Sequence, residues 1–212
     1  MLEFVVTGPA APRGRFLCAH GAGAGMASPF LTKIAALLAE RDLATHRFEF
    51  HYMSERRRSG RRTPPPRAER LTEEVVAAVM AMPPGPPVLI GGKSMGGRVA
   101  SLVADRLSTE GRVCGLVCLG YPFHPPKQPA ALRTAHLERL RCPTLIIQGE
   151  RDPFGSRDEV TGYPLSSAIT VVWASDGDHD LGPRGASGHT RAGNLAAAAD
   201  AIVRFAERVG AG

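Results

Sequence analysis

The stretch VLIGGKSMGGRVA, residues 88–100, decides how this chain folds. It joins a short apolar run, Val88 to Ile90, to a serine between glycines, Ser94, and then continues directly into residues of helical period. A buried strand that passes within a few residues into a helix is typical of a parallel sheet with helices packed on its faces. Toward both ends of the 212 residues, apolar runs and helical segments alternate in the same way.

This alternation predicts an α/β fold in a single domain, residues 1–212: a twisted, mostly parallel sheet of seven strands with helices on both faces. The predicted strands cover residues 3–7, 15–19, 46–51, 88–91, 113–119, 144–148 and 169–173. The predicted helices cover residues 29–40, 67–82, 95–107 and 192–209, with a weaker one at 131–140. The predicted loops are residues 54–66, 82–87 and 121–129, because their prolines cannot donate to a strand ladder.

The composition, 43% hydrophobic and 22% charged, is that of a folded globular domain. A chain of this length buries roughly 70% of its unfolded surface and needs no disulfide or metal to hold a core. Cys18, Cys114, Cys118 and Cys142 form no C-x-x-C pair, so we expect reduced, mostly buried thiols. No segment approaches a membrane span and the N-terminus does not resemble a signal peptide, so we expect a cytoplasmic protein without metal or other cofactor.

Arginine supplies nearly all of the positive charge behind the net charge of +6. A basic segment lies between residues 56 and 70 and contains Arg56, Arg57, Arg58, Arg61, Arg62, Arg67 and Arg70. It is interpreted either as a solvated loop or as a surface that attracts an anionic ligand. No aromatic side chains interrupt it as base stacking would require, so nucleic acid is not a favoured partner.

Residues 92–96 form the pattern G-x-S-x-G, in which a serine sits in a tight turn between strand and helix. Glycines on both sides avoid clashes with the neighbouring backbone, and the exposed hydroxyl of Ser94 can act as a nucleophile. The alternative is a glycine-rich turn in which Ser94 only caps the helix. A phosphate-binding P-loop is excluded because its first glycine is missing at the required spacing.

A serine hydroxyl needs a histidine to remove its proton, and that histidine needs a carboxylate to orient it. Asp152 follows the strand at 144–148 and His179 follows the strand at 169–173, so both lie at the carboxyl edge of the predicted sheet. Glu150 is the rival carboxylate and His189 the rival base. We also consider that Asp152 serves only a turn and that His179 is a surface residue paired with neighbouring aspartates.

The loop at residues 20–25, HGAGAG, follows the strand at 15–19 and lets backbone N–H groups approach a substrate closely. Ala22 and Met95 are the predicted oxyanion donors; a flexible turn is the alternative. Lys93 is expected to face solvent. Four side chains are predicted to line the substrate pocket, with ordinary packing as the alternative: Tyr121, Phe123, His124 and Phe154.

These residues together resemble the α/β-hydrolase superfamily over nearly the whole chain. The chain is most similar to a small dienelactone-hydrolase-like family that includes the hydrolase-like domain of testis-expressed and NSL-complex subunit proteins. The matching strings are HGAGAGMASPF, GGKSMGGR, GYPFHPP, GERDPFG and GDHD. The resemblance implies a first strand that runs antiparallel, with Ser94 as nucleophile, Asp152 as orienting acid and His179 as base.

The resemblance has two departures. Dienelactone hydrolases carry a cysteine at the position that Ser94 occupies, which argues against their particular chemistry. About two dozen residues separate the strand at 113–119 from Thr144, so no cap domain fits and an open site is expected. The expected function is a serine hydrolase of the carboxylesterase or thioesterase type that acts on a small acyl substrate, with an anionic substrate as one alternative. The alternative is an inactive domain of the same fold that binds a partner.

Overall fold

The computed structural model describes residues 2–210 of the chain. Within them, seven strands form one sheet in the order β1-β3-β2-β4-β5-β6-β7. The strands are β1 Val5–Thr7, β2 Gly14–Ala19, β3 Leu43–Phe48, β4 Val88–Lys93, β5 Gly115–Leu119, β6 Thr144–Gly149 and β7 Ile169–Ala174. β1 pairs antiparallel with β3 and the other neighbouring strands are parallel. The predicted fold class and the antiparallel first strand are confirmed.

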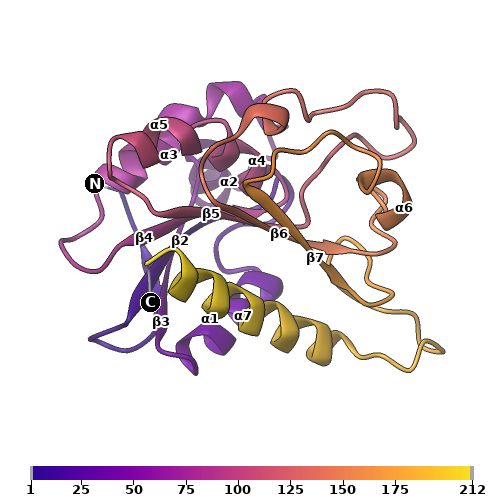
Figure 1. The fold of residues 1–212 in the computed structure, drawn as a ribbon. Coiled ribbons are helices and arrows are strands. Elements are labelled where there is room, and N and C mark those ends of the chain that lie inside the picture. Colours follow the sequence, from indigo (N-terminus) through magenta and orange to yellow (C-terminus); the bar gives the residue numbers. More distant parts are fainter. Residues whose placement is uncertain (1, 211–212) are drawn as a thin grey trace.

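Helices cover both faces of the sheet (Figure 1). They are α1 Pro29–Ala39, α2 His51–Ser59, α3 Thr72–Met80, α4 Met95–Ser101, α5 Ala104–Thr109, α6 Arg157–Val160 and α7 Arg191–Arg208. Single turns of 3-10 helix lie at Ala68–Arg70 and Leu137–Arg139. α1 and α7 pack together on one face, and α3, α4 and α5 lie over the other.

The core has two layers because successive side chains of a strand point to opposite faces. In β2, Phe16 and Cys18 pack toward α1 and α7, whereas Leu17 and Ala19 pack toward α3 and α4. Apart from Arg15 and Lys93, the strands β2, β4 and β5, which are buried on both faces, contain no charged residue, and these apolar runs are the pattern that made them visible in the sequence. All four cysteines are free thiols, and Cys18, Cys118 and Cys142 are buried.

The first four residues of the basic segment, 56–59, are helical, which corrects the assignment of residues 54–59 as loop. β3 ends at Phe48, and His51, expected to end that strand, begins α2. Glu55 forms ion pairs with His51 and Arg58 one turn away, and Gly60 ends the helix in the left-handed conformation. Proline rules out a helix only from residue 64 onward, so the interpretation of residues 54–59 as loop was wrong.

Three predicted helices are shorter than expected. The one predicted at 67–82 divides into the 3-10 turn Ala68–Arg70 and α3, Thr72–Met80. The helix after Ser94 breaks between α4 and α5, where the hydroxyl of Ser101 donates to the Arg98 carbonyl at 2.7 Å and Leu102 N–H turns to Val99. The segment 131–140 contains only the 3-10 turn, because Arg133 N–H donates to Phe123 and ties the chain into a loop. α6 was missed, although Ser156 and Glu159 form a capping box that the sequence displays.

The topology places the carboxyl ends of β2 and β4 beside each other, where the chain direction across the sheet reverses. β2 leads through α1 to β3 on one side, whereas β4 leads to β5, β6 and β7 on the other. Ligands of open α/β sheets bind at such a point because the loops after the two strands diverge and leave a crevice. The loop at residues 20–25 and the turn at Ser94 border this crevice.

Candidate active site

Ser94 is the single residue between β4 and α4, and its backbone has a conformation that few non-glycine residues adopt. Its φ is 50° and its ψ is −114°. A Cβ on Gly92 would lie 2.2 Å from the Ala19 carbonyl oxygen, and one on Gly96 would lie 2.6 Å from the same atom. Only glycine lets the turn approach β2 so closely, and the strained serine is thereby raised out of the sheet.

Asp152 follows β6 and its side chain is fully buried. Its Oδ1 accepts a hydrogen bond of 2.8 Å from the backbone N–H of Phe154, and its Oδ2 accepts one of 3.0 Å from Nε2 of Gln148. The same Oδ2 lies 2.8 Å from Nδ1 of His179. These donors fix the carboxylate and point it at the histidine ring.

His179 follows β7, and its ring is held from two sides. Because the carboxylate of Asp152 accepts at Nδ1, that nitrogen carries the proton and Nε2 keeps its lone pair. The ring of Phe154 covers His179 with centroids 4.3 Å apart. The histidine side chain is 22% exposed, so one edge of the ring remains accessible to a ligand.

Lys93 is buried, which corrects the expectation that it faces solvent. Its Nζ donates to the carbonyl oxygen of His179 at 2.7 Å and lies 3.3 Å from Oδ1 of Asp180. Burial lowers the pKa of the Lys93 ammonium group, and the carboxylates of Asp180 and Asp152 oppose this shift. The last residue of β4 therefore holds the loop after β7.

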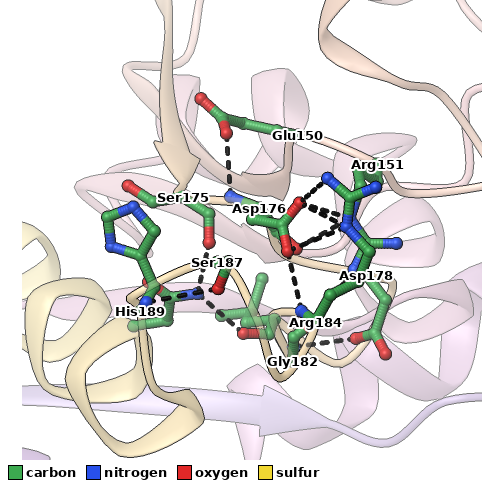
Figure 2. Close-up of polar contacts among 11 residues, drawn as sticks. Glu150, Arg151, Ser175, Asp176, Asp178, Gly182, Arg184, Ser187 and His189 are labelled. Atoms are coloured by element: carbon green, nitrogen blue, oxygen red, sulfur yellow. Dashed lines mark hydrogen bonds and ion pairs between the residues drawn. The ribbon is translucent and has the colours of Figure 1, made fainter.

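A second set of contacts joins the loop after β7 to the loop after β6 (Figure 2). The Asp176 carboxylate binds Arg151 at 2.8 Å and Arg184 at 2.5 Å, while Glu150 accepts from the Asp176 backbone N–H at 2.8 Å. The Arg184 hydrogen bonds lower the pKa of Asp176 to about 2. Glu150 thus supports the loop that carries His179.

The structure therefore brings Asp152, and not its rival Glu150, to His179. Glu150 binds Arg157 and the Asp176 backbone instead. The rival base His189 is exposed, and its backbone N–H donates to the Ser187 hydroxyl (Figure 2). Sequence order alone left both alternatives open.

The loop at residues 20–25 is fixed by two aromatic residues that the sequence analysis did not single out. His20 is buried and lies 2.6 Å from the Gly21 carbonyl through Nδ1, and its Nε2 accepts from Phe50 N–H at 3.1 Å. Burial lowers its pKa, which favours the neutral ring. Tyr52 donates to the Ala22 carbonyl at 3.1 Å. Both side chains hold Ala22 beside Ser94.

Two clefts meet at Ser94. The His-side cleft, about 500 Å³, is lined among others by Lys93, Phe30, His179, Asp180 and Arg191. The Arg-side cleft, about 580 Å³, is lined by Pro65, Pro66, Arg67, Ala68, Glu69, Met95, Arg98, Pro122 and Arg133. Ala22, Ser94 and Phe154 line both. Of the predicted donors, Ala22 therefore lies at the junction and Met95 lines the Arg-side cleft.

Of the predicted pocket residues, Phe154 lines the clefts and the other three lie in the interior. Tyr121 and Phe123 are fully buried and their rings pack 4.9 Å apart, while His124 is 2% exposed and 3.5 Å from Glu159. Tyr121 N–H donates to Gln148, whose amide also binds Asp152. Packing was the alternative reading of these side chains. Tyr121 supports the Asp152 site from behind.

Among residues 2–210, no group of three or more His, Cys, Asp or Glu side chains is arranged to hold a metal ion. The described part of the chain also contains no helix that is long and apolar enough to cross a bilayer.

Three solved structures are similar to this one. Dienelactone hydrolase from Anabaena variabilis is 23% identical, with a TM-score of 0.73 over 98% of this chain and 92% of that one. An α/β serine hydrolase homologue from Coxiella burnetii is 20% identical, with a TM-score of 0.68 over 96% and 90%. An α/β serine hydrolase without lid from Xanthomonas campestris is 18% identical, with a TM-score of 0.68 over 98% and 88%. At these identities the likeness shows the fold.

The family assignment rests on a separate comparison of the sequence. The model of the family described as alpha/beta hydrolase domain matches residues 12–207. This match includes β2, both loops that border the crevice, and α7 at the C-terminal end. Because it covers most of the chain, the protein belongs to the α/β-hydrolase family.

Proposed function

We propose that this protein is a serine hydrolase of small carboxylic esters or thioesters, with Ser94 as nucleophile, His179 as base and Asp152 as orienting acid. The observation that carries the proposal is the 2.8 Å contact between Nδ1 of His179 and the buried Asp152 carboxylate, in a loop whose histidine shares a cleft with Ser94. A histidine oriented in this way presents Nε2 as a base toward the cleft.

In the first half of the reaction, Ser94 Oγ attacks the substrate carbonyl carbon and its proton passes to Nε2 of His179. The carbonyl electron pair moves onto the oxygen, where the backbone N–H groups of Ala22 and Met95 stabilise the charge. The tetrahedral intermediate then expels the alcohol or thiol, which leaves with the proton from Nε2. An acyl-enzyme at Ser94 remains.

In the second half, a water molecule replaces the leaving group beside His179. Nε2 takes its proton while the oxygen bonds to the acyl carbon, and collapse of the intermediate breaks the bond to Ser94 Oγ. The proton returns to the serine and the carboxylic acid is released. Throughout, Asp152 stays ionised and stabilises the protonated imidazole.

The test is intact-mass analysis after incubation with a fluorophosphonate, which reacts only with an activated serine. The wild type should gain one adduct. Ser94→Ala should gain none, and His179→Ala should react slower by at least about a hundredfold, since general-base catalysis contributes about that much. Ser59→Ala is the matched control, because Ser59 is exposed at the end of α2 and its hydroxyl donates to the Glu55 carbonyl of its own helix; it should label as the wild type does.

Two outcomes would contradict the proposal. A folded wild type that forms no adduct and hydrolyses no neutral 4-nitrophenyl ester would favour the alternative, an inactive domain that binds a partner. An adduct that persists in Ser94→Ala would place the reactive group elsewhere. Circular dichroism of each variant separates loss of activity from loss of fold.

A further inference from the structure

We propose that the Arg-side cleft binds an oxyanion, a carboxylate or phosphate group, carried on the acyl part of the substrate. This inference rests on the proposed function and narrows it to esters or thioesters of acids with a second, negatively charged end. It depends on three arginine side chains and on the position of His179 relative to the two clefts.

Arg98 is the centre of the cleft's charge. It lies on α4 one turn after Ser94, and its guanidinium is mostly buried, with the side chain 18% exposed. Nη2 donates to Glu69 at 2.6 Å, but Nε is buried without a hydrogen-bond partner among the described residues. A mostly buried guanidinium beside the cleft with one carboxylate contact would favour a bound anion.

Arg133 and Arg67 add to this charge. Arg133 has a fixed backbone, because its N–H donates to Phe123 and its carbonyl accepts from Tyr121 at 3.0 Å. Partial burial and the neighbouring Arg98 lower the pKa of the Arg133 guanidinium. The lining therefore holds three guanidinium groups against one carboxylate, that of Glu69, which Arg98 already engages.

The geometry of the reaction assigns the cleft to the acyl group. The leaving alcohol takes its proton from His179, so it must lie in the His-side cleft, which His179 lines. The acyl chain extends from the same carbonyl carbon to the other side of Ser94. That side is the Arg-side cleft, whose walls include Pro65, Pro66 and Pro122. An acyl chain there would direct its far end toward the arginines.

The chemistry favours an oxyanion over a neutral polar group. Guanidinium groups match carboxylate and phosphate oxygens in a two-pronged geometry, and their hydrogen bonds to charged acceptors are about twice as strong as neutral ones. The basic segment contributes Arg67 to this cleft, whereas Arg57 lies elsewhere and pairs with Glu3 and Glu49. Only part of that segment thus faces the substrate.

The experiment compares two esters with the same leaving group, 4-nitrophenyl monoadipate and neutral 4-nitrophenyl hexanoate. The wild type should prefer the anionic ester in kcat/KM, corrected for spontaneous hydrolysis. In Arg133→Gln, the ratio of kcat/KM for the anionic ester to kcat/KM for the neutral ester should fall about tenfold, the worth of one charge-assisted hydrogen bond. Arg141→Gln removes the same charge from an exposed side chain, 83% accessible, and should change neither rate.

A reversed pair locates the anion. Here 4-acetoxybenzoate carries the charge on its leaving group and its methyl ester is the neutral counterpart, and Arg133→Gln should leave the ratio of their kcat/KM values unchanged. A 4-nitrophenyl ester of a phosphonoalkanoic acid distinguishes phosphate from carboxylate recognition. The proposal is overturned if Arg133→Gln leaves the adipate preference intact, or if the loss occurs in the acetoxybenzoate pair instead.

The two proposals can fail separately. If the fluorophosphonate labels Ser94 and the neutral ester is turned over, the proposed function stands, and the adipate ratio alone decides the anion site. If neither reaction occurs, the proposed function fails, and calorimetric titration with adipate dianion decides the site. Binding that Arg133→Gln weakens and Arg141→Gln does not would support the oxyanion site; absence of binding to the wild type would overturn it.

Discussion

Nζ of Lys93 donates a hydrogen bond of 2.7 Å to the backbone carbonyl oxygen of His179, 86 residues later in the chain. It joins the residue before the proposed nucleophile to the proposed base. The contact fixes the backbone of His179 from one side, while Asp152 fixes its ring from the other at 2.8 Å. The separation between Ser94 and His179 therefore depends on a buried ammonium group that a sequence pattern alone would place in solvent.

Lys93→Met is expected to lower kcat about tenfold and to leave KM for a neutral 4-nitrophenyl ester nearly unchanged. Methionine fills a similar volume but leaves the His179 carbonyl without its donor, and a hydrogen bond to a charged group contributes about 1.5–3 kcal/mol. The loss should fall on the step in which His179 moves the proton. Steady-state kinetics and the rate of fluorophosphonate labelling measure it.

Lys33→Met is the matched control, because Lys33 is exposed on α1. Lys33→Met should have the same kcat and the same thermal midpoint of unfolding as the wild type. A wild-type kcat in a folded Lys93→Met protein would show that Asp152 and Phe154 suffice to position the histidine.

Asp152→Asn is expected to reduce kcat/KM by about 10³ to 10⁴. The amide oxygen can still accept from Phe154, but the amide nitrogen cannot accept from Nδ1 of His179. The ring would then adopt the other tautomer, with the proton on Nε2, and could not take the serine proton. Ester hydrolysis measures the loss, and unfolding in urea reports the cost in stability.

Glu150→Gln tests the rival carboxylate in the same assays. The loss of kcat/KM in this variant should be less than about tenfold. Glu150 supports the loop through Arg157 and Asp176 N–H and does not touch the histidine. If the two variants exchanged their effects, the assignment of Asp152 would be wrong.

The sequence predicted the strands and the order of Ser94, Asp152 and His179, because each of these residues follows an apolar strand at its carboxyl end. A buried strand has a strong periodic signal, and the topology of a parallel sheet brings such ends together. The β1–β3 pairing came from a family resemblance, since three residues carry too little pattern to show direction.

The sequence could not predict which way the side chains in the loops point. Tyr121 and Phe123 follow β5 at the site edge, yet they point inward to pack against each other and Phe154 alone of that aromatic set faces the clefts. Lys93 points inward because its ammonium group pairs with Asp180 and donates a hydrogen bond to the His179 carbonyl. The Arg-side cleft joins residues from five separate stretches, at positions 22, 65–69, 94–98, 122–133 and 154, so no local spacing could reveal it.

Asp176→Asn is expected to remove part of the pH dependence of unfolding. The pKa of Asp176 in the folded protein is about 2, below its ordinary value of 3.8, because Arg184 and Arg151 bind the carboxylate. The stabilisation is therefore complete above pH 3.8 and is lost as the pH falls toward 2. The free energy of unfolding of wild type should exceed that of the variant at neutral pH, and the difference should shrink over this window.

Chemical denaturation at several pH values measures this difference. Glu138→Gln, which removes an exposed carboxylate from the turn at Leu137–Arg139, serves as the control. If the difference in free energy of unfolding between wild type and Asp176→Asn stays constant from neutral pH to pH 2, the ion pairs of the carboxylate contribute nothing to stability.

Gly96→Ala is expected to destabilise the protein by about 1–3 kcal/mol or more and to slow labelling of Ser94. Alanine normally favours a helix over glycine by about 1 kcal/mol, so helix propensity alone predicts the opposite sign. In α4, however, the new Cβ would lie 2.6 Å from the carbonyl oxygens of Ala19 and His20. The helix must move away from β2, which also displaces Met95 N–H from its place beside Ser94.

Gly185→Ala is the control. Its Cβ would meet nothing within 4 Å, so stability and labelling should stay unchanged. Equal thermal midpoints for the two variants would show that the close approach of α4 to β2 is not needed to hold Ser94 in place.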